Sequence, residues 1–300
     1  MKPAETTAAG AIAVAAPAKI NLYLHLLGRR DDGYHVVDSL IVFLGLADTV
    51  SVSPADGLSL GLSGTCATAL EGTKDNLVLE AARALAEAGG CQADAAIELT
   101  KRVPVAAGLG GGSADAAAAL LALSTLWGLD LPHARLADIA LGLGADVPVC
   151  LESRPVFVGG IGEELESAPE LPPVWVLLVN PGKALATKDV FAAHGGGFTR
   201  PGRFTASLED AGALANLLRP LGNDLTEAAR ALAPEIGDVL EAIEATEGCL
   251  LARMSGSGAT CFGLYADEAG ATAGAGAICG AHPDWRVDMA RLIAGRDDLD

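Results

Sequence analysis

Between Val103 and Leu123 the chain reads VPVAAGLGGGSADAAAALLAL, in which a cluster of glycines is followed directly by a run of alanine and leucine. From Ala114 to Leu126 the residues are apolar nearly all round, which predicts a buried helix rather than a surface helix. Glycines allow backbone N–H groups to come close to a ligand, and the free amides and positive dipole at the start of a helix attract an anion. The stretch therefore favours a loop that binds phosphate groups.

Neither of two common phosphate motifs matches this loop. A Walker A motif requires a lysine after its last glycine, and no lysine follows the glycines here. A dinucleotide-binding motif requires glycine or alanine where Ser113 stands. The simpler alternative is a flexible turn from Gly108 to Gly112, with Ser113 as the N-cap of the helix. Four glycines in five positions, before a helix too apolar to face water, favour phosphate binding over that alternative.

The size and charge of the chain limit its organisation and its partners. It has 300 residues, 51% of them hydrophobic, which suits two domains of ordinary size. We place the domain boundary in ESAPELPP, where prolines and acidic residues occur together, so the predicted domains are 1–167 and 168–300. The net charge of −18 argues against nucleic acid or an anionic membrane surface as a partner. Any anionic ligand must then be held by local groups.

The cysteines and the N-terminal segment indicate the type of cellular compartment. No two of the six cysteines are separated by only two residues, so neither a zinc ribbon nor a redox pair is indicated, and we expect reduced cysteines in the core. The N-terminal MKPAETTAAGAIAVAAPAKI lacks the basic start and bulky apolar stretch of a secretory signal. No window is long and apolar enough to span a bilayer. We expect a cytoplasmic protein that is a monomer or a weak homodimer.

Strand-like and helix-like segments alternate along the chain. INLYLHLL, from Ile20, alternates between apolar and polar residues and predicts a half-buried strand, and the turn in RRDDGYH makes Gly28 to His35 the bend of a hairpin. Strands joined by hairpins, with helices grouped behind them, predict an α+β fold rather than a doubly wound parallel sheet. Helices are expected at 76–88, 114–126, 136–143, 208–218 and 225–245, and further strands at 95–105, 174–179 and on both sides of a loop within 249–265.

Three segments together resemble the GHMP kinase superfamily, named for galactokinase, homoserine kinase, mevalonate kinase and phosphomevalonate kinase. They are PAKINLYLHLLGRRDDGYH, KRVPVAAGLGGGSADAAAAL and RMSGSGATCFGLY. The resemblance spans roughly residues 15–265 and implies a two-domain α+β fold, an active site in the cleft between the domains, and ATP as the phosphoryl donor. PAKINLYL together with DGYH, GLGADVPV and NPGKALATKDVF is similar to the branch that phosphorylates a methylerythritol linked to cytidine diphosphate.

The resemblance assigns the ATP phosphates to the glycine loop. Many members carry Ser-Asn where this chain has Ala114-Asp115. A carboxylate in the first helical turn would repel a triphosphate unless it points away or lies near Mg²⁺, so the role of Asp115 stays open. The residues implied in ATP binding are Pro104, Gly108, Leu109, Gly110, Gly111, Gly112, Ser113 and Ala114.

The resemblance also implies a catalytic pair. Asp146, in GLGADVPV, matches the family's catalytic carboxylate, which accepts the proton of the substrate hydroxyl as that hydroxyl attacks the γ-phosphate. Lys19 matches the lysine that accompanies this carboxylate and would stabilise negative charge on the transferred group. Alternatively, Asp146 only caps the turn before Pro148, and Lys19 is an ordinary solvated strand lysine.

Recognition of cytidine would separate this chain from other members of the superfamily. A cytosine ring needs flat stacking partners and groups that bond its Watson–Crick edge. The resemblance implies Tyr34 and Phe191 as stacking partners and His35 as the residue that reads the edge, with Asn21 and Thr187 as further substrate contacts. Alternatively, Tyr34 is a hairpin residue that covers the core, and Phe191 is an ordinary core aromatic.

The implied reaction transfers the γ-phosphate of ATP to the 2-hydroxyl of the cytidyl substrate. Mg²⁺ is implied because few basic side chains are available to neutralise the phosphates, and the Ser113 hydroxyl is one conceivable ligand. Two other functions stay open: a GHMP kinase for mevalonate, homoserine or a sugar, and a nucleotide-binding protein without catalysis. The presence of both Lys19 and Asp146 argues against a protein without catalysis.

The third of the three matching segments, RMSGSGATCFGLY, is called the third motif below. It is either a hairpin loop or a support for the site through Gly256, Ser257 and Gly258.

Overall fold

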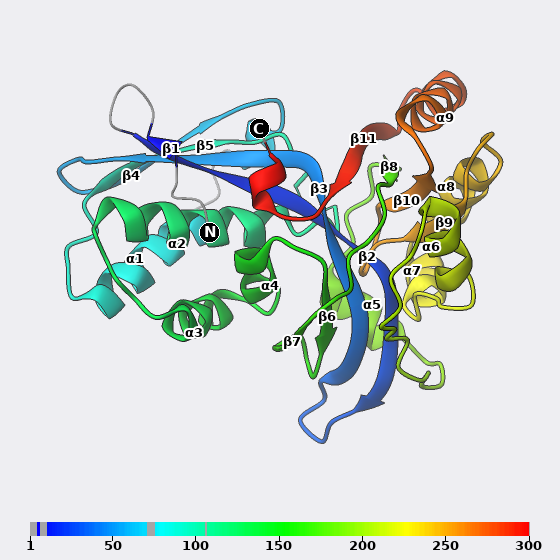
Figure 1. Ribbon diagram of the computed structural model, residues 1–300, viewed down its shortest axis with the longest axis horizontal. Helices are drawn as coiled ribbons and strands as arrows, with labels where there is room; N and C mark the ends of the chain where they lie inside the picture. The colour runs from blue at the N-terminus through cyan, green and yellow to red at the C-terminus, as the bar shows by residue number, and fades with distance from the viewer. Residues whose placement is uncertain (1–4, 7–10, 71–75, 106, 300) are drawn as a thin grey trace.

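The computed structural model describes residues 5–6, 11–70, 76–105 and 107–299 (Figure 1). Residues 1–4 and 7–10, which make up much of the stretch read for a secretory signal, lie outside these ranges. The strands are β1 (Glu5–Thr6), β2 (Ile12–Arg29), β3 (His35–Ser53), β4 (Leu58–Ser63), β5 (Ala95–Thr100), β6 (Val156–Gly159), β7 (Glu164–Ser167), β8 (Trp175–Asn180), β9 (Leu251–Met254), β10 (Cys261–Tyr265) and β11 (Arg286–Ile293).

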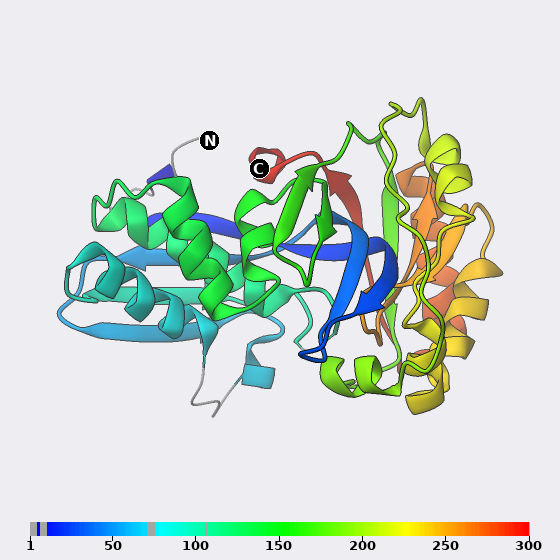
Figure 2. The same cartoon turned by 90° about the horizontal axis from the view of Figure 1, so that it is seen from below.

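The helices lie in two groups, one on each part of the sheet. Helices α1 to α4 cover one face of the sheet region around β2, β3 and β5, and α6 to α9 gather at β8, β9 and β10 (Figures 1 and 2). This arrangement confirms the predicted α+β fold. The helices are α1 (Leu77–Gly89), α2 (Gly111–Leu126), α3 (His133–Leu143), α4 (Val147–Glu152), α5 (Thr187–Ala193), α6 (Ala211–Leu218), α7 (Thr226–Leu232), α8 (Glu235–Glu244) and α9 (Glu268–Ala281), with 3₁₀ turns η1 (Ala67–Leu70) and η2 (Arg296–Asp298).

The long hairpin of β2 and β3 confirms the predicted bend, because the two strands pair antiparallel up to Arg29 opposite His35. The expectation that β2 is only half-buried is wrong. Its polar face is also covered, so that Lys19 is 5% exposed and His25 is 6% exposed. Helix α2 packs on this strand, and Arg253 of β9 reaches the Leu22 carbonyl, so β2 lies between the two groups of helices.

Strand β11 joins the two parts of the molecule. The main path of the sheet is β1-β2-β3-β11-β8-β10-β9, and β11 pairs antiparallel with both β3 and β8. Off this path, β5 pairs with β3 and β4, and β6 pairs with β3 and β7. The predicted domain boundary at 167/168 falls directly after β7, and the division into two domains stays a prediction. Among the described helices, none has the length and apolarity needed to cross a bilayer.

Two of the predicted boundaries differ from the structure for local reasons. The strand expected at 95–105 ends at Thr100, where the chain turns into the glycine loop. The helix expected at 225–245 is two helices, because Pro234 cannot continue α7 and instead begins α8.

All six cysteines are free, but Cys91 and Cys279 are exposed, so the expectation of core cysteines is wrong for these two.

Candidate active site

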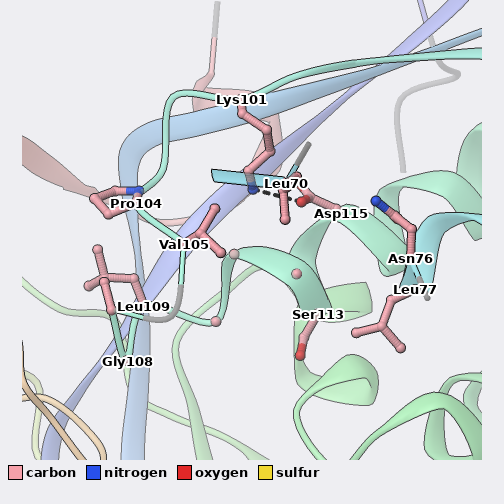
Figure 3. Close-up of a pocket in the computed structure, with 14 residues that line it drawn as sticks. Leu70, Asn76, Leu77, Lys101, Pro104, Val105, Gly108, Leu109, Ser113 and Asp115 are labelled. Carbon is pink, nitrogen blue, oxygen red and sulfur yellow. Dashed lines mark hydrogen bonds and ion pairs between the residues drawn. The ribbon is translucent and has the colours of Figure 1, made fainter. Parts of the chain in front are cut away.

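A cavity of about 310 Å³ lies at the N-terminus of α2 (Figure 3). Its walls come from the start of α1, the residue after β5 and the glycine loop. Of the predicted phosphate contacts, Pro104 and 108–113 line this cavity, whereas Ala114 is 1% exposed inside α2. The loop therefore borders a space at a helix start, as the sequence predicts.

Helix α2 begins three residues before its predicted start, within the glycines. Gly110 is the N-cap, and the Ala114 N–H donates to the Gly110 carbonyl at 2.9 Å. The N–H groups of Gly111, Gly112 and Ser113 precede the helical hydrogen-bond ladder, as at any helix N-terminus, and they can bind an anion. The alternative with Ser113 as N-cap is wrong, since Ser113 lies inside the first helical turn.

The loop packs so tightly that glycine is required at two positions. Gly110 has a φ of 66°, and a Cβ there would lie 2.7 Å from Cγ of Lys19. Gly108 has a φ of 76°, and its Cβ would lie 2.7 Å from the Gly258 carbonyl oxygen. The Lys19 N–H also donates to the Leu109 carbonyl at 2.9 Å. These contacts hold the loop against β2 on one side and the third motif on the other.

Lys19 and Asp146 form an ion pair beside the glycine loop. Nζ of Lys19 lies 3.1 Å from Oδ2 of Asp146, and the two side chains are 6% and 48% exposed. The lysine is thus buried, and the alternative of a solvated strand lysine is wrong. Asp146 is the N-cap of α4, but its side chain accepts no capping hydrogen bond, so the turn-cap alternative is also wrong. The arrangement leaves a half-exposed carboxylate that can accept a proton, next to a fixed cation.

Asn21 holds the lysine in place. Its Oδ1 accepts a hydrogen bond from Lys19 Nζ at 3.0 Å, and its Nδ2 donates to Ser39 Oγ at 2.8 Å. The Asn21 backbone N–H donates to Ser255 Oγ at 3.3 Å. The described contacts of Asn21 are therefore with protein groups that orient Lys19, and its predicted substrate contact stays a prediction.

A buried charge cluster that sequence reasoning missed supports the glycine loop. Lys101 donates to Asp48 and, at 2.7 Å, to Asp115, and Figure 3 shows Lys101 and Asp115 pointing toward one another. Asp48 Oδ1 also accepts from the N–H groups of Arg102 and, at 2.8 Å, Val103, so it anchors the chain where the loop begins. Nothing in the sequence around Asp48 indicates this role, because its partners lie far along the chain.

The contacts within this cluster also show where the Asp115 carboxylate points. Burial lowers the pKa of Lys101, but the neighbouring Asp115 and Asp48 outweigh it, and the result is a raised pKa. Burial raises the pKa of Asp115 to about 7, against the lowering effect of Lys101. Asp115 lines the cavity, and its Oδ1 has no hydrogen-bond partner among the described residues, but its Oδ2 is paired with Lys101. The lysine therefore offsets the negative charge that a bound triphosphate would meet there.

Replacing Lys101 with Met is expected to destabilise the protein by about 3–5 kcal/mol, because it leaves two carboxylates buried without their cation. Asp115→Asn is the matched control: it keeps an acceptor for Lys101 and removes one desolvated charge, so its cost should be below about 1 kcal/mol. Urea unfolding of both variants measures the difference. An equal loss in the two variants would show that the cation does not hold the cluster together.

The predicted cytidine residues gather around the hairpin tip and α5. The ring of His35 lies 5.4 Å from that of Phe191, centroid to centroid, and 6.1 Å from that of His194. Burial, together with the charges of Arg29 and His194, lowers the pKa of His35, which favours a neutral ring with one donor and one acceptor. Tyr34 is 61% exposed and makes no ring–ring contact among the described residues, so it does not cover the core as the alternative required.

The third motif lies between these two regions. Ser255 Oγ donates to the Gly108 carbonyl at 3.4 Å, on the side of the glycine loop. Ser257 Oγ lies 3.0 Å from Oγ1 of Thr187, at the start of α5. Asn223, which sequence reasoning missed, donates to the carbonyls of Met254 and Gly256 and fixes the loop. The motif is thus more than a free hairpin loop, because it connects the phosphate side to the α5 side.

An anion-binding helix start beside a lysine–aspartate pair is an arrangement suited to phosphoryl transfer. Two family models match the chain: the GHMP kinases N terminal domain at residues 76–154 and the GHMP kinases C terminal at residues 204–283. The chain belongs to the GHMP kinases and is a kinase.

Individual relatives have more specific names. A 4-diphosphocytidyl-2-C-methyl-D-erythritol kinase of Paramagnetospirillum magneticum is 54% identical over 94% of this chain and 98% of that protein. The kinase of the same name from Rhodospirillum rubrum is 51% identical over 95% of this chain and 94% of that protein. A crystal structure of 4-(cytidine 5'-diphospho)-2C-methyl-D-erythritol kinase matches with a TM-score of 0.77 at 35% identity, covering 95% of this chain and 100% of that one.

More distant structures share the fold alone. A homoserine kinase from Cytophaga hutchinsonii matches with a TM-score of 0.70 at 20% identity, covering 99% of this chain and 97% of that one. A mevalonate kinase of L. major matches with the same TM-score at 13% identity, covering 98% of each chain. The shared architecture therefore does not select the substrate, which must be argued from local residues and from the relatives of high identity.

Proposed function

We propose that this chain transfers the γ-phosphoryl group of ATP to the 2-hydroxyl of 4-diphosphocytidyl-2-C-methyl-D-erythritol, which gives the 2-phosphate and ADP, a step in the non-mevalonate isoprenoid precursor pathway. The observation that carries the reaction is the Lys19–Asp146 pair, 3.1 Å apart and packed against the glycine loop through Gly110. The choice of substrate is supported by the relatives of that name, which are about half identical to this chain along nearly its whole length.

In the proposed mechanism, the N–H groups of Gly111, Gly112 and Ser113 hold the triphosphate at the start of α2. Asp146 accepts the proton of the substrate 2-hydroxyl, whose oxygen forms a bond to the γ-phosphorus as the bond to the bridging oxygen of ADP breaks. Lys19, held by Asn21, stabilises the negative charge that collects on the transferred group. Gly111, Gly112 and Ser113 line the cavity, and Lys19 packs against Gly110, which lines it too.

We infer that Mg²⁺ accompanies ATP. Among the described residues no cluster of three or more His, Cys, Asp or Glu side chains could hold a metal ion, and Asp115 is engaged by Lys101. This fits Mg²⁺, which commonly binds through substrate phosphates and only one or two protein groups. The Ser113 hydroxyl, on the first turn of α2, is the protein ligand that we propose. Bound Mg²⁺ would neutralise charge on the phosphates.

The other proposals concern organisation. We propose an ATP-binding domain at 1–167 and a second domain at 168–300, with the active site in the cleft between them, because the glycine loop lies in the first and the third motif in the second. We also propose a monomer or weak homodimer that acts in the cytoplasm, where ATP is supplied. The net charge of −18 supports a small-molecule substrate rather than nucleic acid or an anionic membrane surface.

Release of ADP tests the proposed reaction. Purified protein with Mg-ATP is expected to release ADP when the cytidyl substrate is added, and not when mevalonate or homoserine is added. Cytidine diphosphate should compete with the substrate, whereas uridine diphosphate, which presents a different base edge, should compete poorly. Turnover of mevalonate or homoserine, with no competition by cytidine diphosphate, would favour another GHMP kinase activity.

Tyr34→Ala is expected to raise KM for the cytidyl substrate about tenfold or more and to leave KM for ATP unchanged. Stacking of a base on an aromatic ring contributes about 1–3 kcal/mol, and Tyr34 is exposed at the hairpin tip where a ring can stack on it. Phe198→Ala is the matched control, because Phe198 is also exposed but has no proposed role. Steady-state kinetics, with each substrate varied in turn, measures both KM values for the two variants. An equal change in both variants would remove Tyr34 from the substrate site.

A further inference from the structure

Arg296, near the C-terminus, is a partly buried cation whose guanidinium bonds to uncharged oxygens. Its guanidinium donates to the carbonyl of Ala15, to the carbonyl of Cys150 at 2.8 Å and to Ser153 Oγ at 2.6 Å. No salt bridge pairs it with a carboxylate among the described residues. Burial lowers the pKa of Arg296 to about 10. Burying a cation among neutral oxygens costs desolvation energy that no ion pair offsets. The contribution of Arg296 therefore lies in the elements that its hydrogen bonds connect.

The three acceptors belong to the two elements that carry the Lys19–Asp146 pair. Ala15 lies in β2, upstream of Lys19 in the same strand. Cys150 and Ser153 lie at the C-terminal end of α4, the helix that begins directly after Asp146. Arg296 therefore connects β2 to the C-terminal end of α4, whereas Asp146 lies at the N-terminal end. The rigid, planar guanidinium suits this task, because it fixes the directions of several hydrogen bonds at once.

Burial holds the apolar residues of helix α4 in the core, whereas the two ends of the helix depend on polar contacts. The helix has only six residues, and the Asp146 side chain makes no capping hydrogen bond to it. Its far end is closed by Ser153, which has a φ of 46° and donates its hydroxyl hydrogen to the Cys150 carbonyl at 2.8 Å. Arg296 bonds both of these groups, so it secures the end of the helix where carbonyls lack partners within the helix.

The C-terminal segment itself is anchored, so Arg296 can act as a fixed point. Ile293, just before it, is 1% exposed in the same core cluster as Val147 of α4 and pairs with Phe43 of β3. The carboxylate of Asp298 accepts from the Ala294 N–H at 2.7 Å and closes the turn around Arg296. Figure 1 shows this red C-terminal segment beside the long strands, far from its sequence neighbours in α9.

We propose that Arg296 is a positioning residue for phosphoryl transfer: by joining the end of α4 to β2, it sets the separation of Asp146 and Lys19. This inference rests on the proposed catalytic role of that pair. A misplacement of reacting groups by about 1 Å can lower a rate by about 10²-fold, so loss of the link should appear in kcat. The groups that bind ATP and the cytidyl substrate lie elsewhere, so both KM values should be kept.

The test compares Arg296→Met and Arg296→Lys with Arg219→Met. We expect Arg296→Met to lower kcat by about 10–100-fold, with KM for ATP and for the cytidyl substrate changed by less than about twofold. Arg296→Lys keeps the charge but cannot span acceptors on both elements, so its kcat should be intermediate. Arg219 is the matched control: its guanidinium donates to the carbonyl of Leu250, which belongs to neither β2 nor α4, at 3.3 Å, and Arg219→Met should keep kcat within about twofold.

Crystal structures give a readout that does not depend on activity. In Arg296→Met, Lys19 Nζ and Asp146 Oδ2 should lie more than about 4 Å apart, beyond salt-bridge range, instead of 3.1 Å. Unchanged kcat in both Arg296 variants, a loss confined to KM, or an unchanged pair in the crystal would overturn the inference. If Arg296→Met does not fold, Arg296→Lys carries the same comparison. Absence of turnover in the unmodified protein would instead refute the proposed function, and the distance would still test the positioning role.

Discussion

Asp146→Asn should lower kcat for the cytidyl substrate by about 10³-fold, while KM for ATP stays within about a factor of two. Asparagine keeps the size of the side chain but cannot accept the proton of the substrate hydroxyl. The variant also removes the ion pair with Lys19, whose Nζ lies 3.1 Å from the Asp146 carboxylate. The loss therefore combines the missing base with a less well-placed cation. Steady-state ADP release, with each substrate varied in turn, measures both parameters.

Asp138→Asn is the matched control for this prediction. Asp138 lies on α3, its side chain is 71% exposed, and its only ion pair in the described structure is a long one with Arg135 at 4.0 Å. The same chemical change there should leave kcat and both KM values unaltered. If Asp146→Asn turned over at the rate of Asp138→Asn, Asp146 would have no part in proton transfer, and the proposed mechanism would be wrong.

Gly110→Ala should lower kcat/KM for ATP by about 10²-fold or more. Gly110 has a φ of 66°, and its new Cβ would lie 2.7 Å from Cγ and 3.0 Å from Cε of Lys19. The loop or the lysine must move, and either shift changes the distance between the bound phosphate and the Lys19–Asp146 pair. ATP affinity, measured by titration calorimetry, should fall along with the rate.

Gly90→Ala separates this contact from backbone strain. Gly90 is the C-cap of α1 with a φ of 65°, nearly the same as Gly110, but a Cβ there would meet nothing within 4 Å. Both variants should lose about 1 kcal/mol of stability from the left-handed conformation, and only Gly110→Ala should lose activity. Equal activities in the two variants would mean that the tight approach of the loop to Lys19 has no functional role.

The sequence was sufficient to predict much of the fold because the relevant signals are local. The alternation of INLYLHLL and the turn at Gly33 predicted the β2–β3 hairpin, and the glycines before an apolar run predicted α2 and the cavity at its start. The burial of the polar face of β2 could not be predicted, since it depends on groups distant in sequence: Gly110 and Asp146 cover Lys19, and Arg200 and Gly222 contact His25. Alternation shows that two faces differ, but not what covers the second face.

The active-site residues show the same limit, because local sequence patterns do not reveal partners that are distant in sequence. Lys19 and Asp146 were placed together only by the family resemblance, because nothing in their spacing indicates a contact. Asp48 and Arg296 were missed, since each acts through partners that are distant in sequence and has no motif around it. Asp115 looked unfavourable for phosphate binding when read alone. Its buried partner Lys101 offsets the negative charge of the carboxylate and so reduces that conflict.

A crystal structure with a non-hydrolysable ATP analogue and the cytidyl substrate tests the central claim most directly. The account predicts the γ-phosphate at the N–H groups of Gly111 to Ser113, and the substrate 2-hydroxyl within hydrogen-bond reach of Asp146, about 2.6–3.2 Å between oxygens. A triphosphate bound elsewhere with the start of α2 empty, or a hydroxyl that faces away from Asp146, would contradict it.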